Sequence, residues 1–188
     1  PPARALDGPM LTVGMMRGGD KLASYRLIAA ALKCLDSRGR AGDWKLCVAG
    51  DGPARAEVEA LFAPFGAHVE FLGQLDRDSL AAAYAQASLF FWPGVNEAFG
   101  MVYLEAQAHG VPVVAQDRPG VRDVVAAEGL VADPTPDALA AALLTVLNDD
   151  ETHRQRAQEA RDLVQNHHLL TAARQTVWEV LNPLMKET

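Results

Sequence analysis

The feature that most constrains the fold of this chain is a regular alternation between short apolar runs and longer amphipathic stretches. The apolar runs are rich in β-branched and aromatic residues and lie close to Gly or Pro, which is typical of buried strands. We predict strands at residues 11–16, 44–49, 69–72, 88–92, 111–115 and 130–132. Ala, Leu and charged residues dominate the stretches between them, which favours helices at residues 23–38, 54–64, 78–87, 99–109 and 120–127.

This alternation predicts the fold class. A strand, a helix and a second parallel strand are joined by a right-handed crossover, and repeated crossovers cover both faces of a sheet with helices. We therefore predict an α/β fold with a doubly wound, mainly parallel, six-stranded Rossmann-like sheet, helices on both faces and extra C-terminal helices.

The C-terminal part of the sequence predicts only helices. Thr135 or Asp137 is expected to cap the first of them. Residues 150–166 are polar with few apolar anchors, whereas residues 169–185 carry Leu, Val and Trp178 at intervals that suit one buried face.

Length and composition indicate one ordinary globular domain. The chain has 188 residues, of which 49% are hydrophobic and 22% charged, enough for a sizeable core. We place this domain at residues 10–188 and interpret residues 1–9 as a linker or the remainder of an upstream domain. No window approaches the roughly 18 uninterrupted apolar residues of a membrane span, and the first residues lack the apolar core of a secretory signal. A cytoplasmic protein is therefore expected.

Charge and cysteine usage exclude several classes of function. A formal net charge of −7 and a pI of about 5.2 disfavour a broad nucleic-acid surface, because duplex binding needs a basic patch. Cys34 and Cys47 form no Cys-x-x-Cys pair and the histidines are scattered, so neither a disulfide framework nor a zinc site is indicated. Any phosphate site must be local, and no nucleic-acid partner is expected.

The loops after the strands carry the candidate functional residues, because ligands of open parallel sheets bind beyond the carboxyl ends of the strands. The first loop contains Arg17, Gly18, Gly19 and Lys21 at the start of a helix. Arg offers a bidentate fork, Lys a point charge, and Gly a close backbone approach, so the loop suits a diphosphate. A solvated turn with a surface Arg and Lys explains the same residues equally well.

The second loop reads Gly50-Asp51-Gly52-Pro53 and favours a structural turn when it is taken alone. It lacks the third glycine of the dinucleotide fingerprint, which counts against an NAD site. A tight strand-to-helix turn with Pro53 at the first helical position explains it without a ligand.

The third loop, residues 92–102, leaves a buried strand and opens a helix, and it carries the strongest signal. The free N–H groups of Gly100, Met101 and Val102 would point outward at the N-terminus of this helix. The helix dipole favours an anion at the same place. Phosphate oxygens fit there.

Two glutamates, Glu97 and Glu105, flank the start of this helix and are expected to do different jobs, since they need not share one helical face. Glu105 stands in a helix of small residues that is expected to lie flat against the sheet, where a carboxylate needs partners such as two ribose hydroxyls. The structural alternatives are that Glu97 merely favours the positive end of the helix and that Glu105 is an ordinary surface residue.

In combination and order, these segments resemble the nucleotide-binding C-terminal domain of family 4 (group 1) retaining glycosyltransferases, which have the GT-B fold. The resemblance covers nearly the whole chain. Its landmarks are Val13-Gly14 with Arg17 and Lys21, Val48-Ala49-Gly50-Asp51-Gly52-Pro53, Val69-Glu70-Phe71-Leu72-Gly73, the segment from Glu97 to Glu105 with residues 106–115 after it, and Gly120 with Asp123-Val124-Val125. Where the family usually has Lys-Gly, this chain has Lys21-Leu22.

The resemblance implies a site for a nucleotide sugar. Arg17 and Lys21 would hold its diphosphate, and the amides of Met101 and Val102 would reach the other phosphate oxygens. The residues that the resemblance implies for nucleotide-sugar binding are Arg17, Lys21, Gly52, Phe71, Leu72, Phe99, Gly100, Met101, Val102 and Glu105.

The remaining roles that the resemblance implies concern the ribose, the sugar and the base. Glu105 would bind the ribose, and Glu97 would be the catalytic glutamate beside the transferred sugar. Backbone near Phe71 and Leu72 would read the base, so the sequence does not reveal whether the donor carries UDP, GDP or ADP.

The implied activity is transfer of a sugar from a nucleoside diphosphate sugar to a glycan, lipid or small-molecule acceptor, with retention at the anomeric carbon. No cofactor and no metal is expected, and Asp149-Asp150 is interpreted as a helix cap rather than a Mg²⁺ site. A GT-B enzyme has a second, N-terminal domain that binds the acceptor, and this domain is absent from the chain. The isolated chain is therefore expected to bind donor weakly and to transfer nothing.

The absent domain is also where further partners are expected. Any peripheral membrane contact would be made through it, at the inner face of the membrane, and the helix around Trp178 would cross back to it. Two other readings stay open. One is a nucleotide-sugar epimerase or a phosphorylase of the same architecture, although no pyridoxal-phosphate lysine is evident. The other is a non-catalytic nucleotide-binding or interaction module.

Overall fold

The structure, a computed structural model, describes residues 8–40, 44–171, 174, 177, 178 and 182. Within this part of the chain lies a six-stranded sheet in which each neighbouring pair of strands is parallel. The strand order is β3-β2-β1-β4-β5-β6. The strands are β1 (Met10–Val13), β2 (Leu46–Ala49), β3 (Val69–Gly73), β4 (Leu89–Phe91), β5 (Val113–Gln116) and β6 (Leu130–Val131). The predicted α/β fold with a doubly wound parallel sheet is confirmed.

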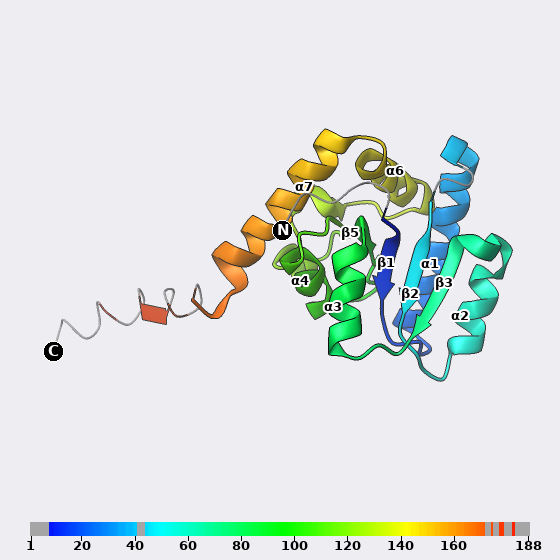
Figure 1. The fold of residues 1–188 in the computed structure, drawn as a ribbon, viewed down its shortest axis with the longest axis horizontal. Helices are drawn as coiled ribbons and strands as arrows, with labels where there is room; N and C mark the ends of the chain where they lie inside the picture. The colour runs from blue at the N-terminus through cyan, green and yellow to red at the C-terminus, as the bar shows by residue number, and fades with distance from the viewer. Residues whose placement is uncertain (1–7, 41–43, 172–173, 175–176, 179–181, 183–188) are drawn as a thin grey trace.

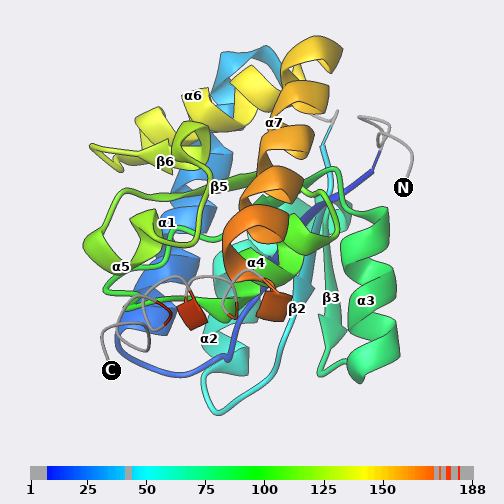
Figure 2. The ribbon, with the colours of Figure 1, turned by 90° about the vertical axis from the view of Figure 1, so that its left-hand side faces the viewer.

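Helices cover both faces of this sheet (Figures 1 and 2). They are α1 (Asp20–Leu35), α2 (Arg55–Phe62), α3 (Arg77–Gln86), α4 (Met101–Ala108), α5 (Pro119–Arg122), α6 (Pro136–Leu147) and α7 (Asp150–Leu163). Short turns of 3₁₀ or π type lie at Asp36–Arg40, Ala63–His68, Ala127–Gly129 and Val164–His168. Helices α1, α2 and α6 lie on one face, and α3 and α4 lie on the other (Figure 2). Helix α7 contacts both α6 and α4.

The centre of the sheet is the most deeply buried part of the molecule, which explains why its strands read as continuous apolar runs. Every residue of β4 and β5 is buried, and Trp92 directly after β4 has no exposed surface. The Trp92 ring meets the Tyr25 ring of α1 edge to face, with 5.2 Å between the ring centroids. This aromatic contact joins α1 to the carboxyl end of β4, beside the loops that form the site.

The first two strands are each shorter in the structure than the sequence predicts, because β1 ends at Val13 rather than at residue 16 and β2 begins at Leu46 rather than at residue 44. The chain leaves β1 at Val13, but the amides of Gly14 and Met16 still donate to the carbonyls of Ala49 and Asp51, at 3.0 and 2.9 Å. The Pro53 prediction is wrong, since α2 begins at Arg55 with Ala54 as its N-cap residue. The amide of Ala54 donates to the carbonyl of Met16 at 2.9 Å, so the neighbouring loop fixes this turn.

The C-terminal helices begin at side-chain caps. Thr135 caps α6 by accepting a hydrogen bond from the Ala138 amide at 3.2 Å, as one of the two predicted alternatives. Asp149 caps α7 by accepting from the Glu151 and Thr152 amides, and the Thr152 hydroxyl also donates to its carboxylate. The hydroxyl hydrogen bond first, and then the two amide hydrogen bonds, lower the pKa of the Asp149 carboxyl.

Helix α7 is better packed than its polar sequence suggests. His153, Ala157, Ala160 and Val164 recur at helical spacing, and all four are buried. Small alanines let the helix approach closely, and Nε2 of His153 lies 2.7 Å from the carbonyl oxygen of Ser88. The pattern of large apolar residues in the sequence does not indicate such an interface, because most of the residues that it buries are alanines and one histidine.

The predicted last helix falls mostly outside the described residues, which omit 172–173, 175–176, 179–181 and 183–188. Among the residues described there, Leu169, Leu170, Val177 and Trp178 are all exposed large hydrophobic residues. Within the described parts of the chain, no helix is long and apolar enough to cross a membrane.

A pair of glycine substitutions tests the close approach of the loops after β1 and β2. Gly50 has a φ of 142°, its amide donates to the carbonyl of Gly73, and a Cβ atom there would overlap the carbonyl oxygen of Gly14. We expect Gly50→Ala to lower the free energy of unfolding by about 2 kcal/mol or more in urea denaturation. Gly18→Ala is the matched control, because a Cβ atom there meets nothing within 4 Å. Equal stability of the two variants would contradict the packing.

Candidate functional site

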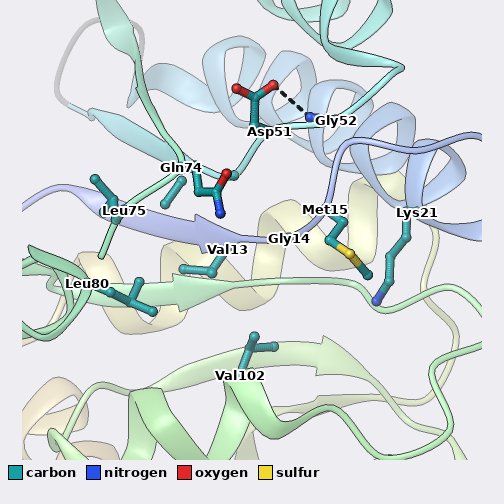
Figure 3. Close-up of a pocket in the computed structure, with 12 residues that line it drawn as sticks. Val13, Gly14, Met15, Lys21, Asp51, Gly52, Gln74, Leu75, Leu80 and Val102 are labelled. Carbon is teal, nitrogen blue, oxygen red and sulfur yellow. Dashed lines mark hydrogen bonds between the residues drawn. The ribbon is translucent and has the colours of Figure 1, made fainter. Parts of the chain in front are cut away.

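The larger cavity of the site lies at the carboxyl ends of the parallel strands and has a volume of about 650 Å³ (Figure 3). The loops after β1, β2 and β3 line it, together with Lys21 of α1, Leu80 of α3 and Val102 of α4. Figure 3 shows Gln74, Leu75 and Leu80 gathered at one end, and Met15 with Lys21 at the other. The cavity is therefore mainly apolar at one end and carries a cation at the other.

Glycines make the wall of this cavity that lies between β1 and β2. Gly52, at a φ of 151°, leaves no room for a Cβ atom because the carbonyl oxygen of Met16 occupies that place. Its amide donates to Oδ1 of Asp51 at 2.7 Å, and the Arg55 guanidinium lies 3.1 Å from the other oxygen of that carboxylate. Gly52 thus presents backbone atoms to the cavity, which allows a ligand to approach the main chain closely.

The loop between β4 and α4 is held in an unusual backbone conformation. Gly94, Asn96 and Gly100 have positive φ values of 67°, 51° and 79°. A Cβ atom on either glycine would overlap the Tyr103 side chain, whose hydroxyl donates to the carbonyl of Trp92 at 3.2 Å. The buried Tyr103 therefore shapes this loop from beneath.

The start of α1 holds the same loop from the side. Nδ2 of Asn96 donates to the Asp20 carboxylate at 3.0 Å, and the Val95 amide donates to Oγ of Ser24 at 2.9 Å. Asn96 is a non-glycine residue in the left-handed region, and this hydrogen bond gives its side chain a fixed partner there. The loops after β1 and β4 are thereby tied together at the carboxyl edge.

An ion pair between Lys21 and Glu97 stands at the centre of these contacts. Nζ of Lys21 lies 2.5 Å from Oε2 of Glu97, and the two side chains are only 20% and 18% exposed. Nε1 of Trp92 donates to the same carboxylate oxygen at 3.4 Å, and the Lys21 ammonium lies 5.2 Å from the centroid of the Trp92 ring. Because both charges rest on a buried indole, their positions are well defined and poorly screened by water.

A second cavity, of about 550 Å³, opens on the other side of Lys21. The loop from Arg17 to Lys21 lines one side and the segment from Val95 to Ala98 lines the other. Lys21 lines both cavities, so a ligand that spans them passes its ammonium.

Two helices at this place begin without a side-chain cap. The N-cap residues of α1 and α4 are Gly19 and Gly100, both with positive φ, and at neither helix start does a cap side chain accept a hydrogen bond from the backbone amides. The Tyr103 amide donates to the Gly100 carbonyl, which leaves the amides of Met101 and Val102 at the start of α4 available to a ligand. With Arg17 and Lys21, this arrangement can bind an anion such as a phosphate.

Glu105 lies one turn further along α4, and its environment differs from the prediction. Helix α4 buries Tyr103, Ala106 and Gln107, but the expectation that the Glu105 carboxylate is buried with them is wrong, because Glu105 is exposed. Its Oε2 still has a specific partner, the Tyr84 hydroxyl of α3, at 3.0 Å. Tyr84 is buried, and burial and then the Glu105 charge raise the pKa of its phenol.

Two predicted residues lie away from the lining of both cavities. Phe71 and Leu72 of β3 are partly buried and pack against the core, with the Phe71 ring 6.1 Å from the Phe62 ring. The cavity is lined instead by the residues just beyond, Gln74 and Leu75. Gly73, at a φ of 67°, marks the point where β3 turns into that loop.

The other predicted residues differ in how close they lie to the two cavities. Phe99 and Met101 are exposed beside the start of α4, Arg17 is exposed in the second cavity, and Val102 lines the first cavity. The sequence does not single out Met15, Leu80 or Tyr84. Leu80 and Tyr84 lie on α3 and belong to the site because α3 packs beside α4. Met15, at 56% exposure, is an apolar residue directly after a buried strand, and that position is the one signal available for it.

A buried amide, Gln107, anchors α4 from the side opposite the cavities. Its Nε2 donates to the carbonyls of Tyr103 and Val124, at 3.1 and 2.5 Å, and its Oε1 accepts from the Ala126 amide at 2.9 Å. Gln107 has no exposed surface. It therefore satisfies the backbone of the turn after α5 and fixes the helix that presents Glu105.

The comparisons with known proteins agree with this fold. The model of the family described as Glycosyl transferases group 1 matches residues 21–163. The chain therefore belongs to the group 1 glycosyltransferase family, and the resemblance stated from the sequence is confirmed.

Similar curated proteins transfer different sugars. The chain is 35% identical over 121 residues to a GDP-mannose-dependent alpha-(1-6)-phosphatidylinositol dimannoside mannosyltransferase of Mycobacterium tuberculosis, covering 63% of this chain and 31% of that protein. It is 33% identical over 124 residues to a sulfoquinovosyl transferase of Arabidopsis thaliana, covering 63% of this chain and 24% of that protein. The chain thus spans about a third or less of the length of these relatives.

Solved structures with the same fold include a protein named as a group 1 glycosyl transferase. A sucrose-phosphate synthase from Thermosynechococcus elongatus has a TM-score of 0.76 at 26% identity, over 98% of this chain and 47% of that one. TarM of S. aureus, solved in a complex that includes UDP, has a TM-score of 0.77 at 16% identity, over 90% of this chain and 34% of that one. The C-terminal domain of a group 1 glycosyl transferase from Francisella tularensis has a TM-score of 0.72 at 21% identity, over 86% of this chain and 87% of that one.

The role of Gln107 is tested by replacing its amide. Gln107→Leu leaves the Val124 carbonyl and the Ala126 amide without their partner, and we expect the free energy of unfolding to fall by about 2–4 kcal/mol. Gln158→Leu, on the exposed side of α7, should change it by no more than about 0.5 kcal/mol. Thermal and urea unfolding of both variants measure the difference, and a stable Gln107→Leu variant would contradict the anchoring role.

Proposed function

We propose that this chain is the donor-binding half of a retaining glycosyltransferase, which moves a sugar from a nucleoside diphosphate sugar to an acceptor. The observation that carries the proposal is the Lys21–Glu97 pair, which stands between a mainly apolar cavity and a polar one at the carboxyl ends of the strands. A nucleotide sugar has the matching order of parts: a flat base with its ribose, a diphosphate, and a hydroxyl-rich sugar.

The diphosphate is assigned to the region around Lys21. Its ammonium, the Arg17 guanidinium and the uncapped amides at the start of α4 supply positive charge from three directions. When the bond between the anomeric carbon and the phosphate oxygen breaks, negative charge builds on that oxygen, and fixed donors stabilise it. We propose that these groups stabilise the leaving group without a metal ion.

The nucleoside is assigned to the 650 Å³ cavity. Leu75, Leu80 and Val102 offer apolar contact to the base, and Gln74 offers one amide that both donates and accepts. Glu105, one turn beyond Val102 on α4, is proposed to accept from a ribose hydroxyl. We move the proposed base contacts from Phe71 and Leu72 to the two residues that follow Gly73.

The transferred sugar is assigned to the second cavity, where Glu97 and Asn96 supply polar groups. We propose Glu97 as the catalytic glutamate, because its carboxylate lies beside the position of the diphosphate and is held by Lys21 and Trp92. Retention at the anomeric carbon follows from the family resemblance and is part of the proposal.

The acceptor is proposed to bind to another part of the full-length protein. The two reported relatives are about three to four times as long as the segment that matches, and GT-B enzymes place the acceptor on an N-terminal domain. A cytoplasmic location, membrane contact through that domain and a crossing of the segment around Trp178 to it are further elements of this proposal. Family membership favours a transferase over an epimerase-like enzyme or a non-catalytic module.

Nucleotide binding tests the proposed donor site. By calorimetry with UDP, GDP and ADP, we expect at least one to bind, and Lys21→Met to weaken it roughly ten- to a hundredfold because a charge-assisted contact to the diphosphate is lost. Lys33→Met, an exposed lysine on the same helix, is the matched control and should bind like the unaltered chain. Binding of none of the three nucleotides would support the interaction module instead.

The proposal for the acceptor has a separate test. Incubated with a nucleotide sugar whose nucleotide it binds and with glycan, lipid and small-molecule acceptors, the 188-residue chain is expected to yield no transfer product by mass spectrometry. The physical reason is that half of the cleft in which transfer takes place is contributed by the acceptor domain. Product formed by this chain alone, and lost in Glu97→Gln, would overturn the division of labour while supporting the donor site.

A further inference from the structure

A buried tyrosine from a different helix fixes the carboxylate that is proposed to bind ribose. The Tyr84 hydroxyl lies 3.0 Å from Oε2 of Glu105, and Tyr84 is only 1% exposed. The same hydroxyl is 3.5 Å from the carbonyl oxygen of Val102, so the carboxylate is its nearer acceptor. Glu105 itself is exposed on α4, and without a partner such a side chain samples several rotamers.

The Tyr84 ring is held rigidly enough to act as a support. It stacks on the His109 ring, with 5.4 Å between centroids and 22° between the planes, and it packs against Phe90 of β4 at 5.9 Å. Nδ1 of His109 lies 2.9 Å from the backbone carbonyl oxygen of Glu105. Helix α3 is thereby locked to the last turns of α4.

Tyr84 and Glu105 lie on the same two helices that form walls of the proposed nucleoside cavity. Leu80 of α3 and Val102 of α4 line the cavity, and Tyr84 and Glu105 each stand one helical turn further along the same two helices. One acceptor position of Glu105 is taken by Tyr84, and Oε1 of Glu105 has no hydrogen-bond partner among the residues that the structure describes. A carboxylate oxygen is thus held one helical turn beyond the residues of α3 and α4 that line the cavity.

We propose that Tyr84 is a positioning residue for ribose recognition: its hydroxyl selects the Glu105 rotamer whose Oε1 accepts from a ribose hydroxyl. This inference rests on the proposed nucleotide site. The hydroxyl is a permanent donor, because burial and the Glu105 charge raise the pKa of the phenol and keep it protonated. Preorganisation of this kind raises affinity by removing rotamer freedom before the ligand binds.

The test compares a nucleoside diphosphate with its 2′,3′-dideoxy form, which has no hydroxyl for Glu105. UDP, GDP and ADP are screened first, and the tightest binder is used with its dideoxy counterpart in calorimetry. We expect Tyr84→Phe to weaken the ribonucleotide about three- to tenfold, the range for one neutral hydrogen bond, and to leave the dideoxy form unchanged. In the Glu105→Gln background, Tyr84→Phe should cause no further loss of ribose preference.

Tyr103→Phe is the matched control, since it also removes a buried phenol hydroxyl from this region but leaves Glu105 untouched. Its ratio of ribonucleotide to dideoxynucleotide affinity should equal that of the unaltered chain, and thermal unfolding verifies that each variant is folded. If Tyr84→Phe binds both nucleotides normally, or weakens both equally, the positioning role is overturned while the nucleotide site stands. If the unaltered chain binds none of the three nucleotides, the proposed function fails and this inference fails with it.

Discussion

The carboxyl edge of this sheet depends on backbone packed directly against backbone. Gly50 and Gly52 stand where a side chain would overlap the carbonyl oxygens of Gly14 and Met16, and Gly120 stands where it would overlap that of Ala98. These contacts bring the loops after neighbouring strands close enough to share hydrogen bonds. The loops are closely packed at these backbone contacts and cannot move relative to each other there. The cavities therefore lie beside the contacts, and both keep a defined shape.

The second organising interaction is electrostatic and follows from the first. Lys21 and Glu97 are 76 positions apart in sequence, yet they form a 2.5 Å contact over the Trp92 ring. Two partly buried charges of opposite sign reduce each other's desolvation cost, and the indole limits where each can lie. The pair keeps a cation at the junction of the two cavities when no ligand is present. A bound diphosphate would then compete with Glu97 for the ammonium, which links donor binding to the glutamate proposed for catalysis.

The same scaffold serves different donors in related proteins, and the cavity suggests why. The curated relatives include a mannosyltransferase that depends on GDP-mannose and a sulfoquinovosyl transferase, while TarM was solved with UDP. In the cavity of this chain, the end occupied by Leu75 and Leu80 is apolar, and Gln74 is the polar side chain beside them. Under the proposed function, apolar walls would accept any flat base, and the side chains after β3 would be the ones that discriminate between bases.

The sequence by itself determined the layer structure and the six strands, and it named the residues that are proposed to surround the diphosphate. Apolar runs that alternate with amphipathic stretches admit few other solutions, and Gly, Lys, Arg and Glu at strand ends carry chemistry that can be recognised locally. The caps at Thr135 and Asp149 were equally local signals, since each side chain serves amides only a few residues away. Strand ends and the start of α2 were misjudged because amides of neighbouring loops, such as that of Ala54, decide them.

The exposure of Glu105, the Tyr84 hydroxyl on its carboxylate, and Gln74 in place of Phe71 in the cavity wall were decided by the tertiary structure alone. The physical reason is that these three features depend on how α3 lies beside α4 and on how β3 turns at Gly73. The spacing of residues within one segment does not encode the distance between two segments.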